Sequence, residues 1–519
     1  MQKLALRILL AVLALGFAQP LGAGGETSSS SRGVRKFTLD QAIQTALQRN
    51  PTLLIAEREI ERTKGVIIEI RAQALPHITV SGTYTWTDPN LTRSTSIFGT
   101  PTTTGTVAPL VASQRSQAGD VQAAATPTPT PGFSSVQQSD VSYDIRVTGT
   151  QLIFNGTTLP AIRGTFFQRD SAYFAFRNVL DQLISTVKTQ FYQVVVNKEL
   201  ISVQEESVHL LESQLKDQQN RFEAGTVPRF NVLQAEVALY NQIPQLIAAK
   251  NNYRIAQLTL AKTLGLDFDP RRGENPPLEV VGEMPYNPRK ISLVDAIEFG
   301  KQRRPFLKQA RANVLNQIEQ VHVALGGFLP TIDATGGGEW VSSPFNSSFH
   351  DISKGWIAGV TGSWPIWDSG QVYGQVKQQR ALLSEAKITY DDDVRQVELE
   401  VQTAYSNLQQ NLELIQSQIK NVEEAEEAVR LAKARLDAGA GVQLDVLNAQ
   451  VQLTTAQSTR LQALFGYNSS LAEFDRATGV QSAYTESFNG IAPHATRSKT
   501  YETGSNRDAE GRRKESLSR

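Results

Sequence analysis

The sequence repeats itself, and this internal duplication constrains the fold more than any other feature of the chain. Residues 37–86 align without a gap on residues 291–340, and 13 of the 50 aligned residues are identical. A second pair of segments, 221–235 and 435–449, aligns at an offset of 214 residues instead of 254, so the first copy holds about 40 extra residues between its blocks. Each copy is predicted to form a helix, a short strand, a loop, a second strand, a very long helix, a tight turn and a returning helix.

The N-terminus and the composition predict an exported protein. Lys3 and Arg7 precede an apolar stretch, and small residues follow as far as Ala23, which indicates a secretory signal peptide over residues 1–23. A lone membrane anchor is the alternative, but the stretch is far shorter than the roughly 20 residues that a membrane-spanning helix needs, and no other apolar stretch reaches that length. The chain has no cysteine, which excludes disulfides and thiolate metal sites. Its 51 basic and 51 acidic residues argue against a nucleic-acid partner, which needs a basic surface.

Four segments alternate between apolar and polar side chains, which is the pattern of a strand with one apolar face. They lie at 77–87, 140–149, 331–340 and 356–366, and a tilted strand of about this length crosses a bilayer. Aromatic residues at their loop-proximal ends predict a girdle at one membrane interface: Tyr84, Trp86, Tyr143, Trp340 and Trp356. A half-buried hairpin of a soluble protein has the same alternation, but the aromatic residues and the export signal favour the membrane.

Four strands cannot close a barrel, and an open edge in lipid leaves backbone groups without hydrogen bonds. We therefore expect the chain to combine its strands with those of identical copies. Two copies would give eight strands, a barrel filled by its own side chains, whereas three copies would give twelve strands and leave room for a pore.

The apolar residues of two longer stretches have coiled-coil spacing. The first, about residues 159–222, would be roughly 95 Å long as a helix, and the second ends near residue 436. Each ends at a glycine-bearing turn, 224–228 or 438–441, and a shorter helix then returns. Asn231 and Asp445 are the predicted N-caps of these returning helices, and Pro244 is expected to kink the first of them. Leu-Pro pairs at 75–76 and 329–330 predict that a helix passes directly into a strand.

Three paired motifs, in this order, resemble those of the TolC-like outer membrane efflux protein family. They are the two Leu-Pro junctions, the strand-to-helix segments 153–156 and 366–370, and the two Ala-Gly turns with the (Asn/Asp)-Val-Leu-x-Ala that follows each. The resemblance covers residues 37–480. It implies a mainly α fold with membrane β: internally duplicated, with long coiled-coil hairpins in a periplasmic α-barrel and four transmembrane strands per chain in a 12-stranded trimeric β-barrel.

The resemblance also implies a function and partners. The protein would be a homotrimeric channel in the outer membrane, with its helical part in the periplasm, and the exit duct of a tripartite efflux or type I secretion system. An inner-membrane transporter would supply the substrate through a periplasmic adaptor protein. The turns would be the periplasmic tips, which act as the gate and dock the adaptor through Phe222, Ala224, Gly225, Thr226, Val227, Asn231, Leu436, Ala438, Gly439, Ala440, Gly441 and Asp445.

The tips depart from the family pattern at one point. Family members often have a tyrosine three residues before the tip glycine and an arginine two residues after it, which together latch the closed state. Phe222 and Val227 occupy these positions in the first tip, and Leu436 and Gly441 occupy them in the second. We therefore expect apolar contacts between the tips to hold the closed state, with Asn231 and Asp445 as the remaining polar candidates.

The predicted organisation follows from these elements and the duplication. After the signal peptide come a linker (24–36), the first helices (37–75), a β-hairpin (76–154) with a Thr/Pro-rich external loop (88–139), a helical hairpin (155–266), a linker (267–290), the second helices (291–329), a β-hairpin (330–367), a helical hairpin (368–480) and a disordered tail (481–519).

The remaining features indicate no catalysis and no cofactor. The five histidines never fall at metal-ligand spacing, and no catalytic set or cofactor fingerprint is present, so neither an enzyme nor a metal site is expected. The acidic runs 391–393 and 423–427 fit a solvated tunnel wall, with cation selectivity as the alternative. Two other kinds of protein have long helices: a periplasmic adaptor (membrane fusion) protein and a structural coiled coil or adhesin. Neither needs paired strand hairpins with an apolar face.

Overall fold

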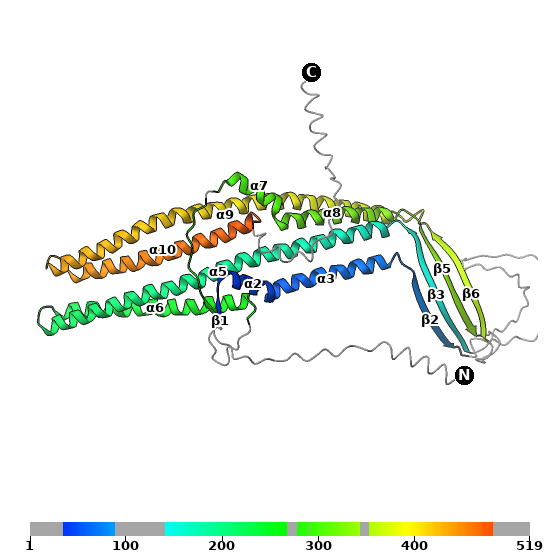
Figure 1. Ribbon diagram of the computed structural model, residues 1–519. Coiled ribbons are helices and arrows are strands. Elements are labelled where there is room, and N and C mark those ends of the chain that lie inside the picture. The colour runs from blue at the N-terminus through cyan, green and yellow to red at the C-terminus, as the bar shows by residue number, and fades with distance from the viewer. Residues whose placement is uncertain (1–34, 89–140, 267–277, 290, 343–351, 481–519) are drawn as a thin grey trace, which may run out of the picture. The chain divides into compact units, whose positions relative to one another are not determined.

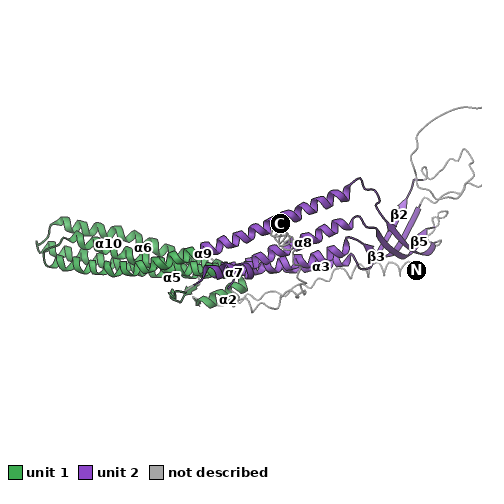
Figure 2. Cartoon of the chain, turned by 90° about the horizontal axis from the view of Figure 1, so that it is seen from above, with its two compact units in different colours: residues 1–51, 183–290, 404–474 green, residues 52–182, 291–403, 475–519 purple. Residues whose placement is uncertain are grey.

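The structure of the chain is a computed structural model that describes residues 35–88, 141–266, 278–289, 291–342 and 352–480. Figure 1 labels its helices and strands, and Figure 2 shows its two units. Unit 1 comprises Met1–Pro51, Leu183–Lys290 and Ala404–Phe474, and unit 2 comprises Thr52–Gln182, Ile291–Thr403 and Asp475–Arg519. The predicted signal peptide, nearly all of the predicted external loop, parts of both linkers and the predicted tail lie outside the described residues.

The duplication recurs in the order and lengths of the elements. Each copy begins with two helices and a strand: α2 (Leu39–Arg49), α3 (Pro51–Ala72) and β2 (His77–Trp86) in the first, and α7 (Leu293–Arg303), α8 (Pro305–Gly326) and β5 (Thr331–Ser342) in the second. A strand, a long helix and a returning helix follow: β3 (Val141–Asn155), α5 (Thr158–Glu223) and α6 (Arg229–Thr263), then β6 (Ile352–Ser363), α9 (Gln371–Asp437) and α10 (Gln443–Ala477). Within the described ranges, no helix combines the length and apolarity needed to cross a membrane.

Equivalent residues begin the two copies. Thr38 caps α2 through a capping box with Gln41, and Ser292, which lies 254 residues later, caps α7 by accepting a hydrogen bond from the Asp295 backbone N–H. Proline then stands at the start of both α3 and α8, where its missing N–H costs nothing. In unit 1, the short strands β1 (Arg35–Phe37) and β4 (Leu278–Val280) pair in parallel.

Three local predictions were wrong. Asn231 and Asp445 are not N-caps: α6 begins at Arg229 because Pro228 already has the extended N-cap conformation, and Asp445 lies in the first turn of α10. The helices do not pass directly into strands, because four residues form a turn between α3 and β2 and again between α8 and β5. The last strand ends at Ser363 instead of continuing to residue 366. Pro244 lies inside α6, which continues on both sides of it.

The long helices of unit 1 bury much of the predicted heptad stripe. In α5 the buried residues include Ile184, Val187, Phe191, Val194 and Leu211. In α9 they include Ala404, Leu408, Ile415, Val422 and Val429. Small apolar clusters join the helices, one formed by Leu211, Leu239 and Leu447 and another by Val422, Ala425 and Ala456. Spacings of three and four residues put these side chains on one helix face, and packing of that face stabilises the hairpins.

A polar contact line between α5 and α10, called here the α5–α10 seam, also runs through unit 1. Its hydrogen-bonded pairs follow an antiparallel register: Ser185 with Glu473 (3.2 Å), Thr189 with Ser469 (3.4 Å), Gln204 with Ser458 (3.4 Å), Ser207 with Thr454 (3.3 Å) and Gln218 with Gln443 (3.3 Å). Short hydroxyl side chains let the two helices approach closely. The seam therefore joins the two hairpins through hydrogen bonds as well as through the apolar cluster of Leu211 and Leu447.

The returning helices end at equivalent glycines. Gly265 follows α6 with φ +65°, and Gly479 follows α10 with φ +67°, a left-handed conformation that favours glycine. A Cβ atom on Gly265 would lie 2.5 Å from the carbonyl oxygen of Arg49, so the glycine also permits the close approach of α2. Beside it the Asn50 side chain donates to the Thr263 carbonyl (2.8 Å) and satisfies an acceptor at the end of α6.

Unit 2 contains an antiparallel sheet of four strands in the order β2-β3-β5-β6. Its register places Gly82 beside Ile145, Ile145 beside Trp340 and Trp340 beside Lys354. A bulge near Leu152 shifts the pairing of β3 with β5 at the helix-proximal end. Gly337 permits close approach of the strands, because a Cβ atom there would lie 2.2 Å from the Val147 carbonyl oxygen.

Candidate functional site

The first tip is a turn stabilised by its own backbone. Gly225 has φ +73°, and its N–H donates to the Phe222 carbonyl (2.9 Å). The backbone N–H and the hydroxyl of Thr226 both donate to the Arg221 carbonyl, at 2.9 and 2.8 Å. These bonds form a Schellman motif, which satisfies carbonyls that would otherwise lack partners at the end of α5.

The second tip has the same geometry 214 residues later. Gly439 has φ +70° and donates to the Leu436 carbonyl (3.0 Å), while the Ala440 N–H donates to Arg435 (2.9 Å). The Asp445 carboxylate reaches back to the Val442 N–H (3.4 Å), which adds a cap that the first tip lacks. The repeat therefore produces two closely similar turns in unit 1.

All of the predicted tip residues lie in or next to these turns, and none is buried. Phe222, Ala224, Gly225, Thr226, Ala438, Gly439, Ala440 and Asp445 are exposed, and Val227, Asn231, Leu436 and Gly441 are half-buried. Phe230 and Val442, which the sequence analysis did not single out, add large exposed apolar surface beside the tips. Exposed apolar residues at the end of a hairpin suit contact with another protein.

In unit 2 the sheet separates apolar from polar side chains. One face, called here the apolar face, carries Ile78, Val80, Tyr84, Trp86, Val141, Tyr143, Ile145, Val147, Ile332, Ala334, Trp340, Trp356, Ala358 and Val360, with glycines between them. Lys354 is its only charged residue within the described strands. The polar face carries threonines, serines and an ion-pair cluster in which Arg146 contacts Glu339 and lies 3.6 Å from Asp144.

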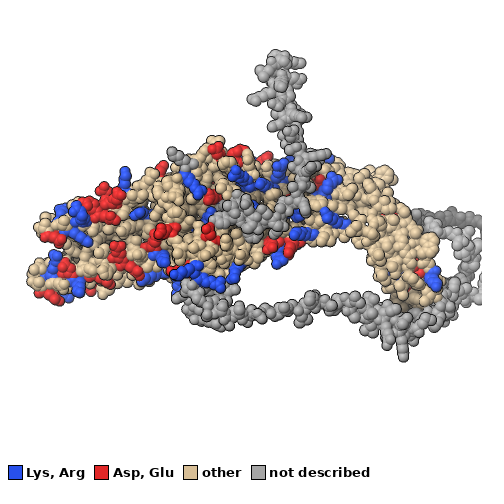
Figure 3. All heavy atoms as spheres, viewed as in Figure 1, with Lys and Arg blue, Asp and Glu red and all other residues tan. Residues whose placement is uncertain are grey.

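The apolar face is exposed in the single chain. Trp356 is 82% and Val360 68% exposed, and every residue of β2 and β6 is exposed. In Figure 3 the surface over the strands shows few charged side chains, whereas the helices carry many. Within the described part of the chain, β2 pairs only with β3 and β6 only with β5, so both outer edges of the sheet lack a strand. An apolar surface of this extent marks an interaction site.

The predicted girdle residues gather at the loop-proximal end of the apolar face. Tyr84 lies directly beside Tyr143, and Trp340 and Trp356 lie on the two neighbouring strands. Tyr143 differs from the others because it is only 8% exposed.

A second aromatic set, which sequence reasoning missed, lies at the helix-proximal end of the sheet: Phe154, Phe328, Trp364, Trp367 and Tyr373. The indole N–H of Trp364 donates to the Phe328 carbonyl (3.0 Å). Trp364 lies within the last alternating run, and the other four lie outside the runs, near the predicted junctions between strands and helices, which was the available signal.

Comparison with known proteins gives the family. A model of the family described as outer membrane efflux protein matches residues 42–266 and 298–480. The chain belongs to this family. The outer membrane efflux protein BepC of Brucella suis biovar 1 (strain 1330) is 24% identical over 334 residues, covering 62% of this chain and 70% of that protein. The outer membrane protein TolC of Escherichia coli (strain K12) is 23% identical over 296 residues, covering 55% and 59%.

Solved structures share the fold of this chain. The Campylobacter jejuni CmeC outer membrane channel superposes with a TM-score of 0.69 at 16% identity, covering 88% of this chain and 89% of that one. The predicted TolC-like family and the mainly helical channel fold are thus confirmed. The adaptor alternative finds no support, since the family and the fold are those of outer membrane channels.

Unit 2 also contains a buried charged cluster, which sequence reasoning missed. Arg304, 4% exposed, contacts Glu400 at 2.5 Å, and Arg476 contacts the same carboxylate oxygen at 3.0 Å. Burial alone would raise the pKa of Glu400, but the charge of Arg304 and hydrogen bonds from Arg304, Gln396 and Arg476 bring it below its usual value. One nitrogen of Arg304 is buried without a hydrogen-bond partner in the described structure.

Asp181, on α5, belongs to the same cluster and is only 6% exposed. Burial raises its pKa to about 6, and the charges of Arg177, Arg304, Arg476 and Lys308 offset only part of that rise. The cluster joins residues that are distant in sequence, so no local pattern could have revealed it. Among the described residues, no group of His, Asp and Glu side chains has a metal-binding arrangement.

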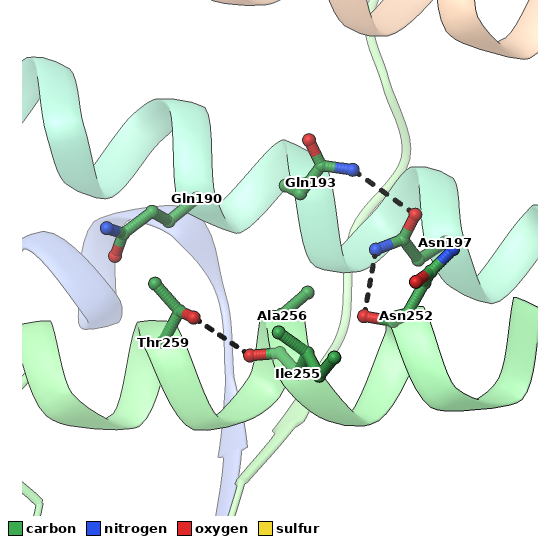
Figure 4. Close-up of a pocket in the computed structure, with 7 residues that line it drawn as sticks. All are labelled: Gln190, Gln193, Asn197, Asn252, Ile255, Ala256 and Thr259. Atoms are coloured by element: carbon green, nitrogen blue, oxygen red, sulfur yellow. Dashed lines mark hydrogen bonds between the residues drawn. The ribbon is translucent and has the colours of Figure 1, made fainter. Parts of the chain in front are cut away.

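A pocket of about 300 Å³ lies between α5 and α6 in unit 1 (Figure 4). Its lining consists of Gln190, Gln193, Asn197, Asn252, Ile255, Ala256 and Thr259 and contains no charged side chain. Asn197 receives a hydrogen bond from Gln193 and donates one to the Asn252 carbonyl, both at 3.2 Å. One hydrogen bond thus joins two of the lining amides, whereas Gln190 Oε1 is buried without a hydrogen-bond partner among the described residues.

Proposed function

We propose that three copies of this chain form a passive channel in the outer membrane, the exit duct of a tripartite efflux or type I secretion system. The helices would cross the periplasm and receive substrate from an inner-membrane transporter through a periplasmic adaptor protein. The observation that carries the proposal is the four-stranded sheet of unit 2, with its exposed apolar face and two unpaired edges. Membership of the efflux family supports it.

The free edges explain why one chain is insufficient. In lipid, each backbone group without a partner costs several kcal/mol, so strands from other copies have to close the sheet. The repeat suggests the pairing: β3 pairs with β5 in the chain, and their counterparts are β6 and β2. Within the chain, Val147 of β3 lies opposite Gly338 of β5. We therefore expect β6 of one copy to pair with β2 of the next copy, with the counterparts Val360 and Tyr84 opposite each other.

The dimensions suit a membrane channel. β6 has 12 residues, which rise about 30 Å at about 3.4 Å per residue and a tilt of about 40°. The hydrocarbon core is about 30 Å thick, and the two aromatic sets would lie near its boundaries. Three copies give twelve strands, enough to enclose a pore lined by the polar face, whereas the eight strands of two copies would be filled by side chains.

The two tips would act as the periplasmic gate and as the adaptor docking site. None of the predicted tip residues in unit 1 is buried. The two tips of this chain lack the tyrosine and the arginine that often latch the closed state in family members. We propose that apolar contacts through residues such as Leu436 hold the gate closed. Leu436→Ala should raise single-channel conductance in a planar bilayer, whereas Ala440→Ser, an exposed position of the same turn, should leave it near the wild-type value. Equal conductance in both variants and wild type would exclude the apolar latch.

The remaining organisation belongs to the same proposal. Residues 1–23 would direct export, the segment 88–139 would form an external loop, and the tail 481–519 would be dispensable. Membrane fractionation, followed by electrophoresis of unheated and heated samples, tests the whole scheme. A heat-modifiable trimer in the outer membrane fraction is expected; a monomer in the soluble or inner-membrane fraction would refute it.

A further inference from the structure

Charged side chains on the polar face of the sheet are confined to its two central strands. Within the described strands, the Asp, Glu, Lys and Arg residues of this face are Asp144 and Arg146 on β3 and Asp333 and Glu339 on β5. The polar face of β2 and of β6 carries none of these residue types in the same ranges. Asp144, Arg146 and Glu339 gather at one level of the sheet and are called here the β3–β5 charge cluster.

Arg146 links the two carboxylates of the cluster. It lies directly opposite Glu339 in the register of β3 and β5, and its guanidinium contacts the Glu339 carboxylate. The Asp144 carboxylate lies 3.6 Å from the same nitrogen of Arg146. An ion pair across neighbouring strands stabilises a sheet, and one carboxylate is enough to form it. The second carboxylate leaves the cluster with a net charge of −1, from one cation and two anions.

The cluster projects beyond its neighbours on the polar face. Ser81 lies opposite Arg146 on β2, and Gly355 lies opposite Glu339 on β6. Both neighbours are far shorter than arginine and glutamate, and a Cβ atom on Gly355 would have no other atom within 4 Å. The Arg146 side chain is 45% exposed although it contacts two carboxylates. The charged groups therefore reach into the space over this face of the sheet.

The cluster also lies at the level of the predicted girdle. Glu339 precedes Trp340 on β5, and Arg146 follows Ile145, the residue opposite Trp340, on β3. Successive side chains of a strand point to opposite faces, so the cluster and the Trp340 side chain lie back to back on the sheet. In the proposed channel, Trp340 would meet the boundary of the hydrocarbon layer at the loop-proximal end, and the cluster would face the pore at the same level.

We infer that the β3–β5 charge cluster controls which ions pass the loop-proximal end of the channel, with its two carboxylates favouring cations and Arg146 limiting that preference. This role rests on the proposed function, in which three copies enclose a pore lined by the polar face. Each copy would contribute one cluster at the same level, so the ring of three would have a net charge of three times −1. Rings of charged side chains control ion selectivity in pores, and low-dielectric walls focus their field.

The width of the pore sets the strength of the effect. Twelve strands about 4.8 Å apart and tilted by about 40° give a backbone radius of about 12 Å. The Debye length is about 30 Å at 0.01 M salt but only about 8 Å at 0.15 M, so the ring acts on an ion at the pore axis mainly at low salt. By Coulomb's law in water, a change of three unit charges in the ring alters the axial concentration of a monovalent ion about threefold at 0.01 M salt.

Reversal potentials of single channels test this role. The full-length protein is inserted into a planar bilayer of phosphatidylcholine with KCl at about 0.01 M on one side and about 0.03 M on the other, where screening is weak. Arg146→Gln makes the ring more negative and should raise the ratio of K⁺ to Cl⁻ permeability at least about threefold, whereas Glu339→Gln makes the ring neutral and should lower the ratio by a similar factor. The double variant Arg146→Gln/Glu339→Gln returns each cluster to a net charge of −1 and should restore the wild-type ratio without restoring the ion pair.

Lys354→Gln is the matched control. Lys354 lies directly opposite Trp340 on the apolar face, so the substitution removes the same charge as Arg146→Gln at the same level of the sheet but outside the pore. The permeability ratio of this variant should equal that of wild type. Glu339→Gln keeps the test decisive even if Arg146→Gln fails to assemble.

The outcomes separate this role from the proposed function. Channels with the same permeability ratio in wild type, Arg146→Gln and Glu339→Gln would overturn the inference and leave the channel intact. A shift with Lys354→Gln as large as that with Arg146→Gln would also overturn it, because the charge on the pore side would then have no special effect. A double variant that differs from wild type as much as Arg146→Gln does would overturn it too, since the loss of the ion pair would then explain the shift. A protein that stays monomeric and forms no channels would overturn both proposals.

Discussion

Replacing Asp181 with asparagine should stabilise the protein at neutral pH, although the residue lies among four cationic side chains. Asp181 is almost fully buried in unit 2, and burial raises its pKa from 3.8 to about 6 despite those charges. The native protein therefore loses stability when this carboxyl ionises. Asparagine has nearly the same shape and no charge, so Asp181→Asn keeps the packing of the neutral form at every pH.

The size and sign of the effect follow from the two pKa values. Each pKa unit corresponds to 1.36 kcal/mol, so a rise from 3.8 to about 6 corresponds to about 3 kcal/mol. Below pH 3.8 the carboxyl is protonated in both states and has no effect on the free energy of unfolding. Between pH 3.8 and 6 the unfolded chain ionises first, so stability falls as the pH rises, and the full loss is present above pH 6.

The measurement is guanidinium-induced unfolding of the purified protein in detergent, followed by circular dichroism between pH 4.5 and 8. Asp181→Asn should exceed wild type by up to about 3 kcal/mol at pH 7.5 and approach it near pH 4.5. Asp391→Asn removes an exposed aspartate of the same unit and should change the free energy of unfolding by less than about 0.5 kcal/mol. If Asp181→Asn is less stable than wild type at pH 7.5, the neighbouring cations outweigh burial and the reasoning fails.

Two further stability effects can be measured in the same way at pH 7.5. Glu400→Gln should lower the free energy of unfolding by about 3 kcal/mol because it leaves the buried guanidinium of Arg304 without its anion. Glu398→Gln breaks a half-exposed pair and should lower the free energy of unfolding by less than about 1 kcal/mol. Similar losses in the two variants would contradict this assignment. Gly265→Ala should cost roughly 2 kcal/mol or more, since φ is +65° and the new methyl would meet a backbone oxygen. Gly374→Ala, with open space around it, should be neutral or stabilising, and a loss equal to that of Gly265→Ala would show that the backbone geometry is irrelevant.

Much of the fold could be predicted because its signals are local and periodic. The heptad spacing placed the first long helix at about residues 159–222, within one residue of α5 at both ends. The alternation of apolar and polar residues located all four strands of the sheet, and the tip glycines were found from the repeat. These elements depend on residues a few positions apart, which a sequence displays directly.

The errors concern features that depend on neighbours in space or on backbone detail. Asn231 has the side chain of an N-cap, but Pro228 fixes an earlier helix start, so local propensity alone misplaced the boundary. The cluster of Asp181, Arg304 and Glu400 assembles from three separate segments of the chain. In the alignment, Arg304 of the second copy occupies the position of Asn50 in the first copy. Only the fold shows that both residues are buried and that they bond to different partners.

The repeat also explains where the single chain remains incomplete. A duplicated chain makes the contact between its first and second copies once, as β3 with β5 in unit 2 and as α5 with α10 in unit 1. The equivalent surfaces at the outer ends are the free edges of β2 and β6 in unit 2 and, in unit 1, the side of α6 that carries Leu233, Val237 and Tyr240, and these surfaces are exposed in the described chain. The same surfaces carry many of its large exposed apolar residues, among them Val80, Trp356 and Tyr240. Because burying such residues would lower the free energy, these surfaces support the proposed association of several chains, and a closed ring would be the arrangement that leaves none of them open.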